Sequence, residues 1–84
     1  MSSFNEKIFE NIVKEAAKNT PKVVDVVVNG FDIFVKYSSK TGKIIQQSHL
    51  VFDKTGKFIA GYGNTTANVP KFLVDKIVEI IKHV

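Results

Sequence analysis

The chain has 84 residues, of which 44% are hydrophobic and 24% charged, and its formal net charge is +4. A chain of this length buries one modest core, so we expect a single domain over residues 1–84, too short to combine a catalytic domain with a separate substrate domain. The absence of cysteine excludes disulfides, thiolate metal sites and cysteine nucleophiles. No basic region followed by an apolar run opens the chain, which predicts a cytoplasmic protein without a membrane segment.

The positive charge is carried by twelve lysines, and the sequence contains no arginine. Arginine is the preferred residue for bidentate contacts with phosphate and guanine. A basic protein built on lysine alone therefore fits charge steering or solubility better than sequence-specific recognition of nucleic acid.

The first predicted element is an amphipathic helix over residues 3–18. Ser3 and Glu6 have the spacing of a capping box, and apolar residues recur every fourth position from Phe4 onward. Pro21 ends the helix because proline has no amide donor and restricts the residue before it.

A β-hairpin is predicted next. Residues 23–28 are β-branched at nearly every position, Asn29-Gly30 is a strong hairpin signal, and apolar and polar residues alternate over 31–37. A two-residue loop at Asn29-Gly30 places Val28 opposite Phe31 and builds one continuous apolar face. The other face of this hairpin is then mixed, with Val23, Asp25, Val27, Asp32, Phe34 and Lys36.

The tetrapeptide Lys-Thr-Gly-Lys occurs twice, at residues 40–43 and 54–57, and both copies are predicted to form turns with a left-handed glycine. They bracket a third strand over about residues 43–53 and precede a fourth over 57–62. A bulge or bend is expected in the polar middle of the third strand, at residues 46–49, because neither simple register buries all its apolar residues on one face.

A turn-rich loop over residues 61–68 leads into a second helix that starts at Asn68 and runs to the C-terminus. Its apolar stripe is wider than contact with a sheet alone requires. The stripe comprises Leu73, Ile77, Ile80 and Val84, with Val74, Val78 and Ile81 beside it. The order α-β-β-β-β-α predicts an α+β fold, a four-stranded antiparallel meander with both helices packed on one face.

Catalytic and metal-binding patterns are lacking in the sequence. The two histidines, His49 and His83, do not form a close pair with ligand spacing. Ser48 and His49 are adjacent in a strand and point to opposite faces, so they cannot form a dyad. We therefore expect no enzyme activity, no metal and no cofactor.

Two apolar surfaces predict a non-catalytic protein-interaction module, a homo-oligomer or a partner of another protein. The candidate interface residues are Phe34, Val23 and Val27 on the outer sheet face, and Val74, Val78 and Ile81 on the second helix. The alternative is that the first helix covers the helical stripe and that Phe34 is a lone exposed aromatic residue.

The other functional hypothesis is an electrostatic binder of nucleic acid or a phosphorylated ligand. In a meander, the first Lys-Thr-Gly-Lys turn lies at the same end as the exit of the first helix and the entrance to the second, whose amino terminus favours anions. The candidate residues are Lys18, Lys22, Lys40, Lys43, Lys71, Gly63 and Asn68. Their simpler interpretation is a solvated lysine rim around a connecting loop.

Overall fold

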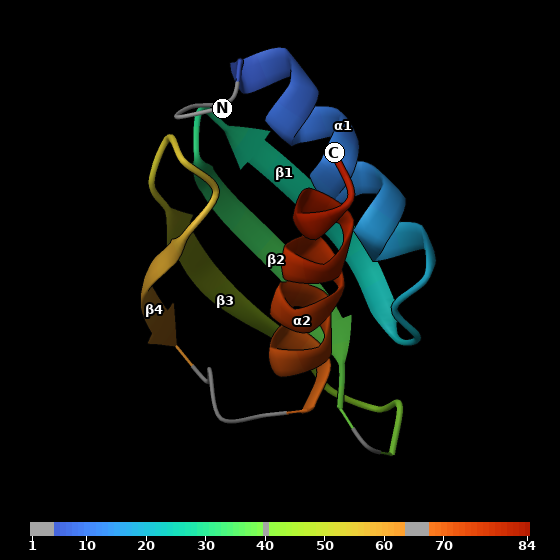
Figure 1. The fold of residues 1–84 in the computed structure, drawn as a ribbon. Helices are drawn as coiled ribbons and strands as arrows, with labels where there is room; N and C mark the ends of the chain where they lie inside the picture. The colour runs from blue at the N-terminus through green and yellow to red at the C-terminus, as the bar shows by residue number, and fades with distance from the viewer. Residues whose placement is uncertain (1–4, 40, 64–67) are drawn as a thin grey trace.

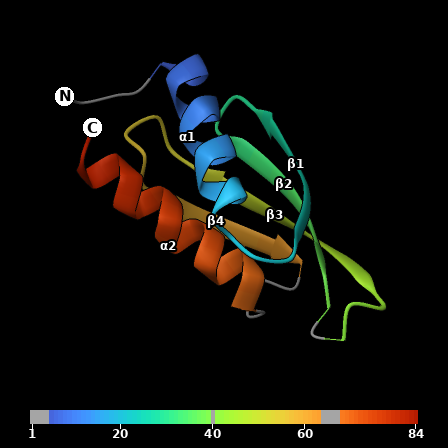
Figure 2. The same cartoon turned by 90° about the vertical axis from the view of Figure 1, so that its right-hand side faces the viewer.

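The structure, a computed structural model, describes residues 5–39, 41–63 and 68–84. Its elements are α1 (Glu6–Lys18), β1 (Val23–Asn29), β2 (Asp32–Ser38), β3 (Ile45–Phe52), β4 (Phe58–Gly63) and α2 (Asn68–Lys82). The strands are antiparallel and lie in the order β1-β2-β3-β4. Both helices pack on the same face of the sheet (Figures 1 and 2). The predicted α+β meander is confirmed.

Helix α1 begins at Glu6 because the side chain of Asn5 caps it. The Asn5 carboxamide oxygen accepts hydrogen bonds from the amides of Lys7 at 2.7 Å and Ile8 at 3.4 Å. The predicted helix start at residue 3 is therefore wrong: Asn5 has an extended backbone and is the cap, and Ser3 itself lies outside the described residues. At the other end, the hydroxyl of Thr20 donates to a carbonyl of the last turn and the chain turns toward β1.

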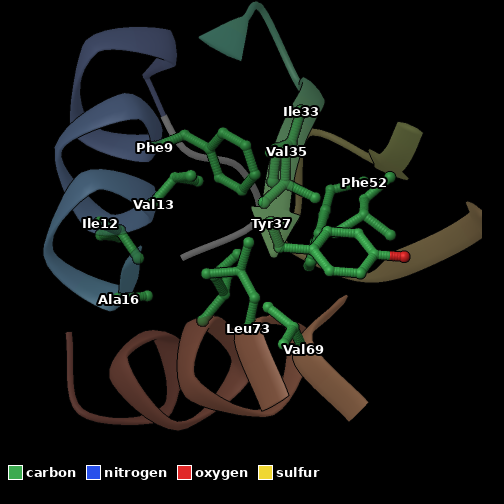
Figure 3. Close-up of a cluster of buried hydrophobic side chains, with 12 residues drawn as sticks. Phe9, Ile12, Val13, Ala16, Ile33, Val35, Tyr37, Phe52, Val69 and Leu73 are labelled. Carbon is green, nitrogen blue, oxygen red and sulfur yellow. The ribbon is translucent and has the colours of Figure 1, made fainter. Parts of the chain in front are cut away.

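The hydrophobic core fills the space between the two helices and the inner face of the sheet. Figure 3 shows side chains from α1, β2 and α2 pointing toward one another. The ring of Phe9 lies 5.0 Å from that of Phe31 and 5.4 Å from that of Phe52, measured between centroids. The hydroxyl groups of Tyr37 and Ser48, both buried, are 3.3 Å apart. The polar middle of β3 is thus compatible with a buried inner face.

The first hairpin has a different register from the predicted one. Asn29 pairs with Asp32, so the two-residue loop is Gly30-Phe31, with φ +66° at Gly30. Val28 therefore lies opposite Ile33 instead of Phe31. The displacement is two residues, so the same side chains still face the core. It also leaves Phe31 in the loop, where its ring reaches Phe9.

A bulge in β1 overturns the placement of Val23 on the outer face. The register shifts between Val23 and Asp25, so that Val23 pairs with Tyr37 and packs against the core. The intervening Val24 is 58% exposed instead. The extra residue inverts the alternation of side chains at the start of the strand.

The prediction of a bulge in the middle of β3 is also wrong. Pairing between β2 and β3 is continuous from Asp32 opposite Val51 to Ser38 opposite Ile45. The irregularity lies at the other edge of β3, between Val51 and Phe52, where β4 contributes an extra residue. The isoleucines before residue 46 are exposed, so the strand does not have to bury all its apolar residues.

Helix α2 contacts α1 and lies over the sheet beside it (Figure 1). Its buried residues are Val69, Pro70, Leu73 and Ile77. The neighbouring positions Val74, Val78 and Ile81 are half-buried and pack against the core. Neither described helix is long and apolar enough to cross a membrane.

Candidate functional site

The outer face of the sheet is the side opposite α1 and α2 (Figure 2). The register places Val27 of β1, Phe34 of β2, His49 of β3 and Tyr62 of β4 directly beside one another. These four residues, one from each strand, are called the cross-strand row. Residues opposite each other in adjacent strands share a face, so the row runs across the full width of the sheet.

Ring contacts join three members of the cross-strand row. Phe34 and His49 are stacked, with centroids 4.4 Å apart and an interplanar angle of 16°. His49 and Tyr62 are 5.4 Å apart and tilted by 33°. Val27 is 54% exposed and Tyr62 58% exposed, whereas Phe34 is half-buried by its neighbours. The row is thus an ordered apolar surface that remains open to solvent.

Charged residues lie on both sides of the cross-strand row. Lys36 and Asp25 are paired positions on one side, and Asp32 lies on the other. The Nε2 atom of His49 is 3.3 Å from Oδ1 of Asp32, close enough for an ion pair when the imidazole is protonated. That nitrogen is buried and its geometry does not satisfy a hydrogen bond. The outer face therefore combines a central aromatic stripe with separated charges of both signs.

The predicted interface residues of α2 are less accessible to a partner than those of the outer sheet face. Val74, Val78 and Ile81 are half-buried because the wide stripe of α2 contacts both α1 and the sheet. The exposed apolar side chain of this helix is instead Phe72, which is 51% exposed. The sequence alone did not single out Phe72, because it lies outside the main stripe. Of the predicted outer-face residues, Phe34 and Val27 are on the open side and Val23 is not.

The structure brings only part of the predicted lysine cluster together. The exit of α1, with Lys18 and Lys22, the turn containing Lys43 and the start of α2 at Asn68 lie toward the same end of the sheet (Figure 1). Lys71 instead borders a separate hollow of about 190 Å³ between α2 and β4. Lys40 lies outside the described residues, as does the central part of the predicted 61–68 loop.

A larger hollow of about 550 Å³ opens at this end of the molecule. Its described lining residues are Pro21, Lys22, Tyr37, Ser38, Ser39, Gln46, Asn68, Val69 and Phe72. Lys22 is the only charged residue among them, and the other described candidate lysines, Lys18, Lys43 and Lys71, do not line this hollow. Lys22 has a left-handed backbone, φ +71°, and its carbonyl accepts the amide of Ser38.

Gly63 has a backbone role that is sufficient to explain it. Its φ is +86°, and a β-carbon at this position would lie 2.9 Å from the carbonyl oxygen of Gln47. Only glycine tolerates both the left-handed conformation and this close approach of β3. Gly63 therefore allows β4 to lie close to β3 at the end of the sheet.

Among the residues that the structure describes, no three histidine or acidic side chains are grouped as a metal site would require. His83 is paired with Glu79 on the exposed end of α2, far along the chain from His49. Asp53 has a structural role, because its carboxylate accepts hydrogen bonds within the β3–β4 turn. These groups have no shared geometry for acid–base chemistry.

The fold and the cross-strand row define a small α+β protein with an open-faced four-stranded sheet. No protein family matches the chain, and neither curated proteins nor solved structures show significant similarity to it. Its function is therefore inferred from the residues and geometry of its surfaces.

Proposed function

We propose that this protein is a non-catalytic protein-interaction module that self-associates through the outer face of its sheet. The observation that carries the proposal is the cross-strand row, which places an exposed valine and three rings in contact across all four strands. Contiguous apolar surfaces of this kind mark interfaces on small proteins, whereas single exposed apolar residues do not.

The size of the protein supports an assembly. An interface of standard size removes about 800 Å² of surface from each partner. That is about one seventh of the 5336 Å² accessible here. A core built from so short a chain also gains stability when two copies share an apolar surface.

The charges favour a protein partner over a nucleic acid on this face. Its outward charged residues on the strands are two acids, Asp25 and Asp32, and one base, Lys36. The local balance is negative although the whole chain is positive. A phosphate backbone requires several basic contacts, so the sheet face is unsuited to it despite its aromatic rings.

The proposal is tested by sedimentation of the full chain over a wide range of concentrations. We expect the wild-type mass to rise to that of a dimer and Phe34→Lys to remain monomeric, because lysine places an unpaired charge in the centre of the row. Phe72→Lys is the matched control, since it introduces the same charge at an exposed phenylalanine on α2. Circular dichroism establishes that each variant is folded. A wild-type protein that stays monomeric at every concentration contradicts self-association.

The lysine end supports a second candidate, an electrostatic binder of nucleic acid or a phosphorylated ligand. The first turn of α2 contains no acidic residue, and the positively charged connections at Lys18, Lys22 and Lys43 lie toward the same end. The test is a titration with a mixed oligonucleotide and then with inorganic phosphate at low and high salt. Binding that weakens steeply with salt and is reduced in Lys18→Glu/Lys43→Glu supports this candidate. Binding that is independent of salt contradicts it.

A further inference from the structure

We infer that the two copies pack about a two-fold axis that runs across the strands along the cross-strand row, so that Lys36 of each copy meets Asp32 of the partner subunit. This inference rests on the proposed self-association and specifies its geometry. It commits the open face to one occupant, a second copy of this chain.

The argument begins with the positions of two charges on β2. Asp32 lies two residues before Phe34 and Lys36 two residues after it, so both share the outer face with the cross-strand row. One side of the row carries Lys36 and Asp25, and the other carries Asp32 and Asn29. The two charges of β2 are therefore complementary to those of a second copy that is turned end to end, whereas Asp25 faces Asn29 of the partner subunit.

Two simple rotations place the sheets face to face, and the charges distinguish them. Rotation about the row reverses strand direction, keeps β2 over β2 of the other copy and brings Lys36 over Asp32 of the partner subunit. Rotation about an axis parallel to the strands instead places β2 over β3, which puts Asp32 against Val51 and Lys36 against Gln47. The second arrangement buries both charges against neutral groups, which costs free energy, so complementarity selects the first.

Symmetry doubles the benefit of this arrangement. In a two-fold interface each contact occurs twice, so both copies pair their lysine and their aspartate. Members of the cross-strand row meet their own counterparts at the axis, which places aromatic rings from the two copies within stacking reach between sheets about 10 Å apart. The apolar centre and the flanking charge pairs then form one continuous interface.

A charge exchange between two variants tests the pairing. Asp32→Lys and Lys36→Asp each place like charges across the axis, and each is expected to weaken self-association by about tenfold or more. An equimolar mixture pairs lysines of the first variant with aspartates of the second and should form heterodimers in native mass spectrometry. The double variant Asp32→Lys/Lys36→Asp exchanges both charges within one chain and should recover the wild-type dimerisation constant.

Asp25→Lys is the matched control, because it makes the same charge change on the same face opposite Asn29 of the partner subunit. It should not form selective heterodimers with Lys36→Asp. If Phe34→Lys dissociates the dimer but the mixture yields no heterodimer and the double variant is not restored, the pairing is wrong and self-association through this face stands. If the wild-type chain is monomeric throughout, both the pairing and the proposed function fail.

Discussion

Phe34 and His49 stack across β2 and β3 with their ring centroids 4.4 Å apart. The histidine also contacts Tyr62 on its other side, so its ring lies between the rings contributed by β2 and β4. Its side chain is 32% exposed, which leaves part of the imidazole in contact with solvent. This position makes His49 the link between the two halves of the open face.

Replacing His49 by alanine tests that link within the monomer. We expect the free energy of unfolding to fall by about 1 kcal/mol, because two ring contacts are lost. Urea denaturation at low protein concentration measures this change without a contribution from self-association. Gln47→Ala, on the same strand and face but outside the ring contacts, is the control. Equal losses in the two variants would show that the stack adds nothing to stability.

Asp53 is expected to make the domain sensitive to acid. Its carboxylate accepts the hydroxyl of Thr55 and the amides of Lys57 at 3.0 Å and Thr55 at 2.9 Å. These hydrogen bonds, that of the Thr55 hydroxyl foremost, hold the pKa of Asp53 below its ordinary value. Because the pKa of Asp53 is lower in the folded than in the unfolded protein, the ionised carboxylate stabilises the fold at pH values above the unfolded-state pKa. This stabilisation is lost as the pH falls through the folded-state pKa.

Thermal unfolding should therefore reveal a decline in the midpoint that begins near pH 4, where an unfolded aspartate takes up its proton. Asp53→Asn should be less stable than wild type at neutral pH. Its unfolding midpoint should also change less with pH in this acid range. Asp75→Asn on α2 serves as the control for loss of one negative charge. A wild-type midpoint with the same acid dependence as that of Asp53→Asn would exclude the turn as its source.

Gly63 and Gly42 both have a left-handed backbone, so alanine substitutions at the two positions compare the destabilisation caused by adding a side chain. Their φ angles are +86° and +79°, but a β-carbon at Gly42 meets no atom within 4 Å, whereas one at Gly63 meets a backbone oxygen of β3. Gly42→Ala should cost about 1 kcal/mol of unfolding free energy through backbone strain alone. Gly63→Ala should cost clearly more, and similar values from denaturant titrations would contradict the close approach.

The buried hydroxyl contact between Tyr37 and Ser48 is expected to stabilise the core. Tyr37→Phe removes one side of the 3.3 Å contact and should lower the free energy of unfolding by about 1 kcal/mol. The effect of Tyr62→Phe, on the solvent side of the sheet, should be smaller. A double-mutant cycle with Ser48→Ala measures the coupling, and additive losses would mean that the two hydroxyls do not stabilise each other.

Local sequence patterns were sufficient to predict the elements and their order. The four-residue apolar period before Pro21 marks α1, and the β-branched run before Gly30 marks β1. The repeated glycine turns separate the remaining strands. These signals depend on neighbours a few residues away, so they can be interpreted without knowledge of the tertiary structure.

The register of the strands and the face on which each side chain lies were predicted less well, because both depend on contacts between distant elements. The loop position that allows Phe31 to reach Phe9 requires α1 to be in place. The bulge that turns Val23 inward is stabilised by the same core, and the sequence around it carries no turn signal. Burial of Ser48 against Tyr37 removes the need for a bulge in the middle of β3.

The candidate site illustrates the same division. Phe34 and Val27 were recognised from the alternation within one hairpin, but His49 and Tyr62 were not joined to them. Side chains from four strands share a row only when three separate registers agree, and each register is set by turn geometry and by which face of the strand is buried. Composition and periodicity thus specify the fold of this protein, whereas its open aromatic face arises from long-range pairing.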